Sequence, residues 1–551
     1  MINHVHRPGA RSLSIRGAIV LILLILIIPL VSSGSRTASA QAIDQQRLEI
    51  ALLQTYFISV DNFAGPVMMG GMGVPLVPTM VPPDMFQGMM GQMAQMANFD
   101  PANMPANPGL LAAIYTSADP RLVPGAEVNP MDFGSMRWDP EGFDTTVTTL
   151  DQAMLIMKFV EWAKFFHKGF NGEAILFPTP EMEAFLSLVF TAEGLMISQF
   201  AGANLMTPDG YIKSINFDNG TREVVDDTID PFDQAVMLWA LSDLIYTIKN
   251  TEEYPNLGML ADQIATPEMM QQLMEMWDQT FELVKSHPVS NVKNRGLTIV
   301  ALSWYAAAKG NQAPMNEIFA TVNSLARGLG NVEDTAFEKA ASIRGLIEAW
   351  RITGNVDYLN NAMDLWNELN SLWDDEAKTF APTADSVTYE YTPWDAGLII
   401  GALSEIIAAT DDGVPSDVKD EATDRFLDFF DSTIVASGFT HLPVPTPGRS
   451  GLLVSNISYD TSTGTWTVND ARYTTAGALY AANEMIWIEG SLQGRLTGYP
   501  EIPSLQTAAA NQPKAPSVGD IVPPAWVLAG LSVVGVLLFG SGVLVLKERR
   551  R

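Results

Sequence analysis

Acidic and aromatic side chains gather at the starts of several predicted helices, where they could act together on one substrate. Glycoside hydrolysis needs two carboxyl groups across the scissile bond, one protonated and one ionised, and aromatic rings that hold the sugar. The best catalytic pair combines one acid of Glu333 and Asp334 with Asp395 or Asp230. The full set comprises the candidate catalytic residues Glu333, Asp334, Asp395, Asp230 and Asp470 and the candidate substrate-binding residues Trp394, Tyr391, Tyr473, Trp466 and Arg295.

The same positions also have a purely structural interpretation. Asp, Asn, Ser and Thr are preferred helix N-caps, and acids in a first turn interact favourably with the helix dipole. Asp226, Asp227 and Asp233 share one predicted helix start with Asp230, so this start is acidic whichever residue does chemistry. The sequence therefore leaves two readings open, paired catalytic carboxylates or helix capping alone.

Other catalytic chemistries find less support. His287 and His441 fall in predicted loops beside helix starts, which keeps a base-catalysed epimerase or lyase possible, although a single loop histidine can equally be incidental. The sequence has no G-x-S-x-G, P-loop or dinucleotide fingerprint and no His/Asp spacing typical of a transition-metal site. We therefore predict no cofactor and no metal.

The helices that must position these residues are clearest in residues 331–380. A first helix is apolar on most of its circumference and ends at Gly354, where a left-handed cap is expected. A second helix follows at once, and its residues Leu359, Met363, Trp366 and Leu369 fall on one stripe. The pattern predicts a buried inner helix paired with an outer helix that covers only one face.

This pair recurs along the chain. Lys309-Gly310-Asn311 and Thr353-Gly354-Asn355 precede successive outer helices at a spacing of 44 residues, which indicates an internal repeat. The predicted outer helices lie near 43–58, 180–200, 266–286, 313–328, 356–373 and 417–434. The predicted inner helices lie near 147–166, 230–249, 290–309, 332–353, 394–409 and 470–488.

Long connections are predicted mainly at the end where the inner helices begin. Two of them have hairpin patterns, residues 211–225 around Asn219-Gly220 and residues 452–468 around Thr463-Gly464. Six helix pairs with loops at one end favour an all-α (α/α)6 toroid with small β-hairpin insertions. An open α-solenoid is the structural alternative.

This organisation resembles the superfamily of (α/α)6 toroids that includes six-hairpin glycosidases, polysaccharide lyases and sugar epimerases. The resemblance covers about residues 43–490 and is carried by the helix count and by turns after outer helices, Asp209-Gly210-Tyr211, Lys378-Thr379-Phe380 and Ser437-Gly438-Phe439. No family's catalytic motif is intact. The resemblance therefore implies a carbohydrate partner but no particular reaction, and a non-catalytic glycan-binding or scaffold protein is the alternative.

Charge and composition exclude other classes of protein. Asp and Glu number 62 against 32 Lys and Arg, for a net charge of −30, and basic residues concentrate at the two ends of the chain. An acidic body is a poor partner for nucleic acid. The absence of cysteine removes disulfides, zinc-thiolate sites and thiol catalysis.

The two ends predict an address. Residues 1–40 have the three parts of a secretory signal, with arginines, the apolar run 17–31 and the small residues Ala38-Ser39-Ala40; an uncleaved anchor is the alternative. Residues 501–524 form a Pro/Ala-rich stalk, 525–546 a transmembrane helix, and 547–551 a basic cytoplasmic tail. We expect a prokaryotic single-pass membrane protein whose N-terminal body, residues 41–500, lies outside the cytoplasm. No LPxTG-like motif precedes the tail.

The body contains an unusual Met/Pro/Gly-rich insert at 61–146. Residues 68–104 hold ten methionines, and Met89, Met90, Met93 and Met96 would lie close together on a helix. Thioethers suit Cu(I), which makes copper binding one hypothesis. The alternative, which we favour because the stretch lacks Cys and His, is a flexible apolar loop that folds over the mouth at the starts of the inner helices or holds a partner.

Overall fold

The computed structural model describes residues 36–129, 131–218, 220–331, 335–409, 414–441 and 451–492. By its internal contacts the chain divides into residues 1–50 and residues 51–551, and the described part of the first unit is the beginning of helix α2 (Arg36–Phe63). Everything that follows concerns the second unit. The predicted stalk, transmembrane helix and tail lie outside the described residues, as do Glu333, Asp334 and most of the predicted signal sequence.

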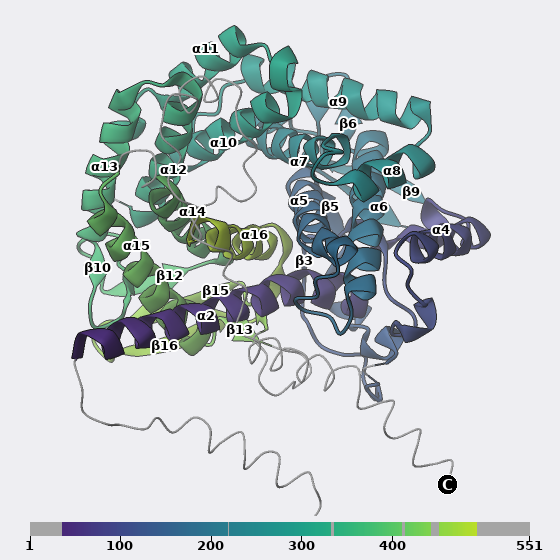
Figure 1. Ribbon diagram of the computed structural model, residues 1–551, viewed down its shortest axis with the longest axis horizontal. Coiled ribbons are helices and arrows are strands. Elements are labelled where there is room, and N and C mark those ends of the chain that lie inside the picture. The colour runs from purple at the N-terminus through teal and green to yellow at the C-terminus, as the bar shows by residue number, and fades with distance from the viewer. Residues whose placement is uncertain are drawn as a thin grey trace, which may run out of the picture. The chain divides into compact units, whose positions relative to one another are not determined.

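Six helices form an inner ring in which each packs against the next. They are α5 (Thr149–Phe166), α7 (Pro231–Lys249), α10 (Val292–Lys309), α12 (Ala336–Thr353), α14 (Pro393–Ala409) and α16 (Thr475–Leu492). Helix α16 also packs against α5, so the ring closes (Figure 1). Closure excludes the open solenoid and confirms the (α/α)6 toroid.

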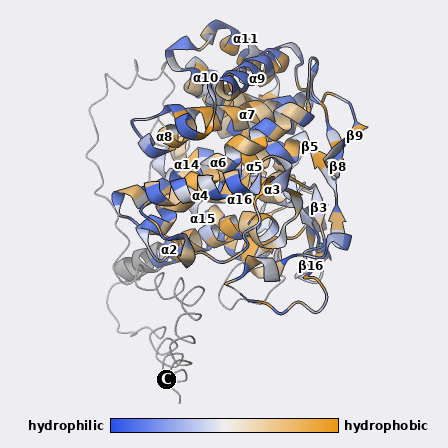
Figure 2. Ribbon diagram, turned by 90° about the vertical axis from the view of Figure 1, so that its right-hand side faces the viewer, coloured by the Kyte–Doolittle hydropathy of each residue, from blue (hydrophilic) through white to orange (hydrophobic). Residues whose placement is uncertain are grey.

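A second layer of helices covers the ring from outside. It contains α6 (Pro180–Asn204), α9 (Pro267–Ser286), α11 (Met315–Ala326), α13 (Val356–Asn370) and α15 (Ser416–Phe429), each packed on the inner helix that precedes it in the chain. The sixth position is held by residues 51–63 of α2, where Ser59 donates to the carbonyl of Ala482 on α16 and Phe63 packs on Phe159 of α5. Figure 2 shows hydrophilic and hydrophobic residues alternating along α11, as expected for a helix with one buried face.

Three small antiparallel sheets lead directly into inner helices. They are β5 (Thr146–Thr148) with β8 (Ser214–Asp218) and β9 (Thr221–Asp226), β12 (Thr388–Tyr391) with β15 (Asn456–Asp460) and β16 (Thr465–Asp470), and β4 (Phe143–Asp144) with β3 (Ser117–Ala118) and β17 (Tyr473–Thr474). Their registers include Asn216 opposite Glu223 and Tyr459 opposite Trp466. The two predicted hairpins are confirmed. Because β5, β12 and β17 end where α5, α14 and α16 begin, the sheets surround the N-terminal end of the ring, here called the ring mouth.

Shorter elements complete the described chain. The two-stranded sheets pair β1 (Gly73–Pro75) with β2 (Leu111–Ile114), β6 (Met206–Thr207) with β7 (Gly210–Tyr211), β10 (Trp373–Asp374) with β11 (Thr379–Phe380), and β13 (Thr440–His441) with β14 (Leu452–Leu453). Helices α3 (Leu76–Thr79), α4 (Pro83–Met96) and α8 (Pro255–Ile264) lie outside the double ring of helices. Within the predicted turns, Gly210 and Gly438 have positive φ.

The Met-rich insert is folded rather than loop-like. Helix α4 packs on the outer helix α6. Met93 is buried, whereas Met85 is 60% exposed. Copper binding by the methionine sulfurs of this insert stays a hypothesis.

One helix of the described residues is long and apolar enough to cross a membrane, namely α6. It is almost entirely buried against the other helices. Its hydrophobicity therefore reflects core packing.

Charged side chains lie buried in the lumen of the ring. Arg344 of α12 is ion-paired with Glu484 of α16 and Glu405 of α14, and Arg351 pairs with Glu405 and Glu348. The guanidinium of Arg344 lies against the rings of Trp239 and Trp487, which stack on each other at 5.4 Å. All of these side chains are buried. The network links four of the six inner helices.

Helices α10 and α12 cross at a pair of glycines. A Cβ on Gly345 would lie 2.5 Å from the Cα of Gly296, and a Cβ on Gly296 would lie 2.1 Å from the carbonyl oxygen of Ala341. Backbone atoms cannot move aside as a flexible side chain can, so larger residues at this crossing would push the helices apart.

We predict that Gly345→Ala lowers the free energy of unfolding by about 1 to 3 kcal/mol, because the added methyl overpacks the crossing. Gly88→Ala is the matched control, since Gly88 lies in helix α4 with nothing within 4 Å of an added Cβ. It should raise stability by up to about 1 kcal/mol through helix propensity. Urea denaturation of the full-length protein measures both, and equal effects of the two substitutions would contradict the close crossing.

Candidate active site

Aromatic side chains from opposite inner helices meet across the axis of the helix ring, at the ring mouth. Trp394, in the first turn of α14, packs edge to face against Phe232 of α7, with ring centroids 5.9 Å apart. Trp394 also packs on Tyr480 of α16 at 4.5 Å. In the order of inner helices, α7 and α14 stand opposite each other. The Phe232–Trp394 contact therefore spans the lumen and forms an aromatic floor beneath the mouth.

Asp233 follows Phe232 and is held in an unusual environment. Burial chiefly, and then the negative charges of Asp230 and Asp151, raise the pKa of Asp233 to about 7, against the opposing effect of Lys213. Within the part of the chain that the structure describes, no hydrogen bond to its carboxyl group is present. Asp233 can therefore hold a proton at neutral pH and release it to a bound group.

Asp395 follows Trp394 and is held by polar partners. The hydroxyl of Thr392 donates to Oδ2 of Asp395 at 2.7 Å, and the amide of Asp395 donates back to that hydroxyl at 3.2 Å. The Nζ of Lys293, from α10, lies 3.6 Å from Oδ1 and also lies over the ring of Phe337. Asp395 is thus an ion-paired carboxylate fixed in orientation from both sides.

Two further acids, Asp230 and Asp151, lie at the starts of α7 and α5, at the ring mouth. Asp230 caps α7 by accepting from the amide of Phe232 at 2.8 Å. Asp151 of α5 is buried, and burial raises the pKa of Asp151 to about 7 although the hydroxyls of Thr148 and Thr116 donate hydrogen bonds to it. The negative charge of Asp151 is one of the smaller causes that raise the pKa of Asp233.

The predicted sugar platforms Tyr391 and Tyr473 are fully buried. The hydroxyl of Tyr391 donates to the carbonyl of Phe380, and that of Tyr473 donates to the carbonyl of Asn62 at 2.7 Å. Trp466 is half-buried on β16 and packs against Tyr459. Of the four predicted aromatic residues, Trp394 is the one in contact with the opposite side of the ring.

The remaining predicted residues lie apart from the aromatic floor. Arg295 of α10 donates to the carbonyls of Leu325 and Arg327, where it caps the C-terminal end of α11. Asp470 ends β16 and pairs with Arg472 at 2.8 Å. Of the predicted acids, the structure thus brings Asp230 and Asp395 next to the floor, while Glu333 and Asp334 lie outside the described residues.

Sequence reasoning named Asp233 only as a neighbour of Asp230 and missed Asp151 altogether. Both stand in the first turn of a helix behind a capping residue, Asp230 and Thr148 respectively, so their pattern is that of an ordinary helix start. What sets them apart is burial, which depends on segments distant in sequence. For Asp151 these include Thr116 and Ala476.

The histidines do not join this group of residues. His287 follows the C-terminal end of α9, where its Nδ1 faces the hydroxyl of Ser286 at 3.0 Å, and His441 ends β13. Among the described residues, no cluster of three or more His, Cys, Asp or Glu side chains could hold a metal ion.

We predict that Asp233→Asn weakens the pH dependence of folding stability. A carboxyl whose pKa is about 7 when folded and near 3.8 when unfolded adds stability below pH 3.8 and loses it as the pH rises through 7. Between pH 4 and pH 8, the free energy of unfolding of the wild type should therefore fall by up to about 4 kcal/mol more than that of the variant. Urea denaturation across this range tests it, with the exposed Asp262→Asn as control. Equal slopes for wild type and Asp233→Asn would show that Asp233 titrates normally.

No family model and no curated protein matches this chain. Similar solved structures include a D-mannose isomerase, with 10% identity and a TM-score of 0.43 over 74% of this chain and 98% of that chain. A cellobiose 2-epimerase from Bacillus thermoamylovorans B4167 has 10% identity and a TM-score of 0.43 over 73% of this chain and 99% of that chain. An endoglucanase from the termite Nasutitermes takasagoensis has 12% identity and a TM-score of 0.37 over 81% of this chain and 98% of that chain. At these identities and TM-scores, the likeness bears on neither the residues nor the reaction of this chain.

Proposed function

We propose that this protein is a surface-anchored carbohydrate-active protein that hydrolyses glycosidic bonds at the ring mouth. One observation carries the proposal. Phe232 and Trp394 touch across the ring axis, and each is followed directly by an acid, Asp233 and Asp395. Two carboxyls beside an aromatic floor are what glycoside hydrolysis requires.

The two acids have environments that suit different roles. No group among the described residues donates a hydrogen bond to the carboxyl of Asp233, and its pKa of about 7 fits a general acid that protonates the leaving oxygen. Asp395 is ion-paired with Lys293 and oriented by Thr392, which fits the carboxylate that attacks the sugar or activates water. Trp394 and Phe232 would lie against the apolar face of a sugar ring.

The anchoring part of the proposal rests on the sequence. Residues 1–40 fit a secretory signal, and residues 525–546 fit a single transmembrane helix followed by a basic tail. Together they would hold the toroid outside the cytoplasm with its carbohydrate partner.

A second candidate function is glycan binding without catalysis. It is favoured by the local bonds of two acids, because Asp230 and Asp395 both bond to the first turns of their own helices. An acid used as a cap keeps its position after catalysis is lost. Capping a helix does not require the ion pair between Asp395 and Lys293, so this ion pair favours the first candidate, glycoside hydrolysis.

We predict that full-length protein in detergent releases reducing ends from a member of a polysaccharide and oligosaccharide panel. Asp233→Asn and Asp395→Asn should each lower kcat about 100-fold or more, since they remove proton transfer or the attacking carboxylate. The exposed Asp385→Asn is the matched control and should keep full activity. Binding measured in the same wells separates the two candidates: binding without turnover supports the glycan receptor, and turnover unaffected by either substitution rules out these acids.

The pH profile gives an independent prediction. If Asp233 donates the proton, kcat/KM of the wild type should fall tenfold per pH unit above about pH 7, where the pKa of Asp233 lies. Initial rates between pH 5 and pH 9 measure it. An alkaline limit several units higher would assign the acid to another residue.

A further inference from the structure

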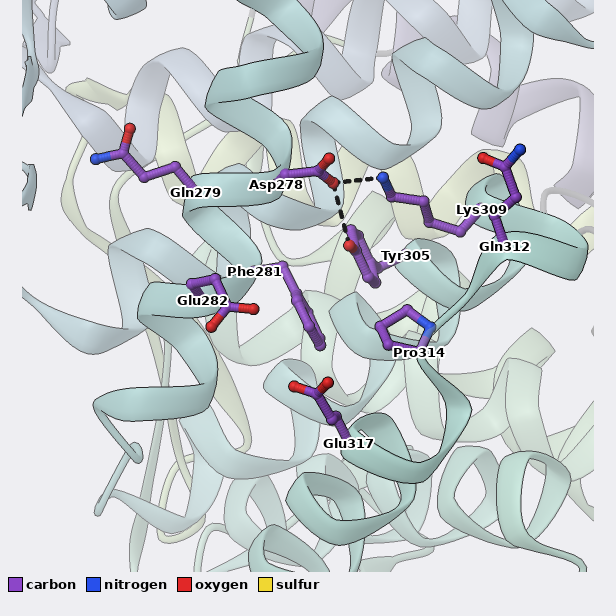
Figure 3. A pocket seen from close by; sticks show the side chains of 9 residues that line it. All are labelled: Asp278, Gln279, Phe281, Glu282, Tyr305, Lys309, Gln312, Pro314 and Glu317. Carbon is purple, nitrogen blue, oxygen red and sulfur yellow. Dashed lines mark hydrogen bonds and ion pairs between the residues drawn. The ribbon is translucent and has the colours of Figure 1, made fainter.

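A pocket of about 420 Å³ lies away from the ring mouth, near the C-terminal end of α10. Its walls come from the outer helix α9, the inner helix α10 and the start of α11 (Figure 3). It is lined by Asp278, Gln279, Phe281, Glu282, Tyr305, Lys309, Gln312, Pro314 and Glu317. None of these residues belongs to the site proposed above.

The floor of the pocket is aromatic. Phe281 of α9 and Tyr305 of α10 stack nearly parallel, with centroids 4.2 Å apart and planes inclined by 5°. The hydroxyl of Tyr305 donates to Oδ1 of Asp278 at 3.2 Å. Burial chiefly, and then Asp278, raise the pKa of Tyr305, so this hydroxyl remains a donor. The floor is thus fixed between two helices.

The walls are held by ion pairs between helices. Lys309 of α10 lies 2.5 Å from Asp278 and over the ring of Trp277 at 4.4 Å. Lys285 of α9 pairs with Glu282 at 2.6 Å and with Glu317 of α11. These contacts hold the wall side chains in place, so little conformational entropy is lost on binding.

The charges of the walls select the kind of ligand. Three carboxylates would repel an anion, and each already has an ammonium partner, so a cation would have to compete with Lys285 or Lys309. The carboxylates are still half or more exposed, and each has unused acceptor sites. Gln279 and Gln312 add amides that both donate and accept.

We propose that this pocket binds a neutral, polyhydroxylated ligand such as a single sugar unit, independently of the ring mouth. Hydroxyl groups would donate to Glu282 and Glu317 and accept from Gln312 and Lys309. The apolar face of the ring would lie over Pro314 and the Phe281–Tyr305 stack. The volume falls within the range of small-molecule sites.

The test uses three monosaccharides of one size and different charge, titrated by calorimetry into full-length protein. Glucose should bind saturably, and glucosamine and glucuronate should bind at least fivefold more weakly. Glu282→Ala and Gln312→Ala should each weaken glucose binding about fivefold, as expected for one lost hydrogen bond. The double variant should weaken it at least tenfold.

One control makes the result specific. Gln272→Ala changes an exposed glutamine of α9 that lies nearly three turns before Glu282, and it should leave glucose binding unchanged. Glucose binding that is lost in Asp233→Asn and kept in the pocket variants would place the sugar at the mouth and overturn the proposal. No saturable glucose binding, or equal binding of the charged sugars, would overturn it as well. Neither outcome touches hydrolysis, which is measured separately.

Discussion

The ring depends on a guanidinium group buried in its lumen. Arg344 is almost fully buried, and the free energy of its desolvation is offset by Glu484, Glu405 and two indole rings, which contact it from three other helices. Removing one partner of such a group leaves a buried charge uncompensated, which is why α7, α12, α14 and α16 have one favourable arrangement. Burial raises the pKa of Glu484 to about 7 even against the opposing effect of Arg344. The position of the mouth residues, about two to three turns along α7 and α14, follows from this packing.

At the mouth, burial outweighs the local effects that usually govern helix starts. The dipole of α7 and a nearby lysine favour an ionised Asp233, yet its pKa is raised. Asp395 stands at the equivalent place on α14 and differs because Thr392 and Lys293 face its oxygens. Two acids with similar sequence surroundings thus acquire different partners from what packs over them. Such a division of properties is what acid–base chemistry with two carboxyls needs.

The architecture could be predicted from the sequence, whereas the site could be predicted only in part. An inner helix that is apolar on most of its circumference has few alternatives to burial, and alternation of apolar and polar residues around Thr463-Gly464 specifies a hairpin. The structure confirms the buried helix α12 and the hairpin of β15 and β16. Tyr391 and Tyr473 were expected to hold substrate, but the same aromatic character made them core residues. Asp151 and Asp233 carry no local mark, since Thr116 and Ala476, which help enclose Asp151, come from segments far away in the chain. Local spacing reports the start of a helix but not what covers it.

Closure of the ring has a consequence for its ends. An open array of helix pairs exposes an apolar flank at each terminus and needs polar capping repeats there. Here α16 packs on α5, so all six inner helices have neighbours on both sides. The closing contact joins residues 149–166 to 475–492, and a loop of that length is entropically expensive to shut. Residues 51–63 lie along this seam, where Ser59 bonds α16, Lys158 of α5 bonds the same carbonyl of Ala482, and Phe63 packs on α5. Residues 51–63 therefore hold α5 and α16 together. Loss of their contacts would open the ring between these two helices first.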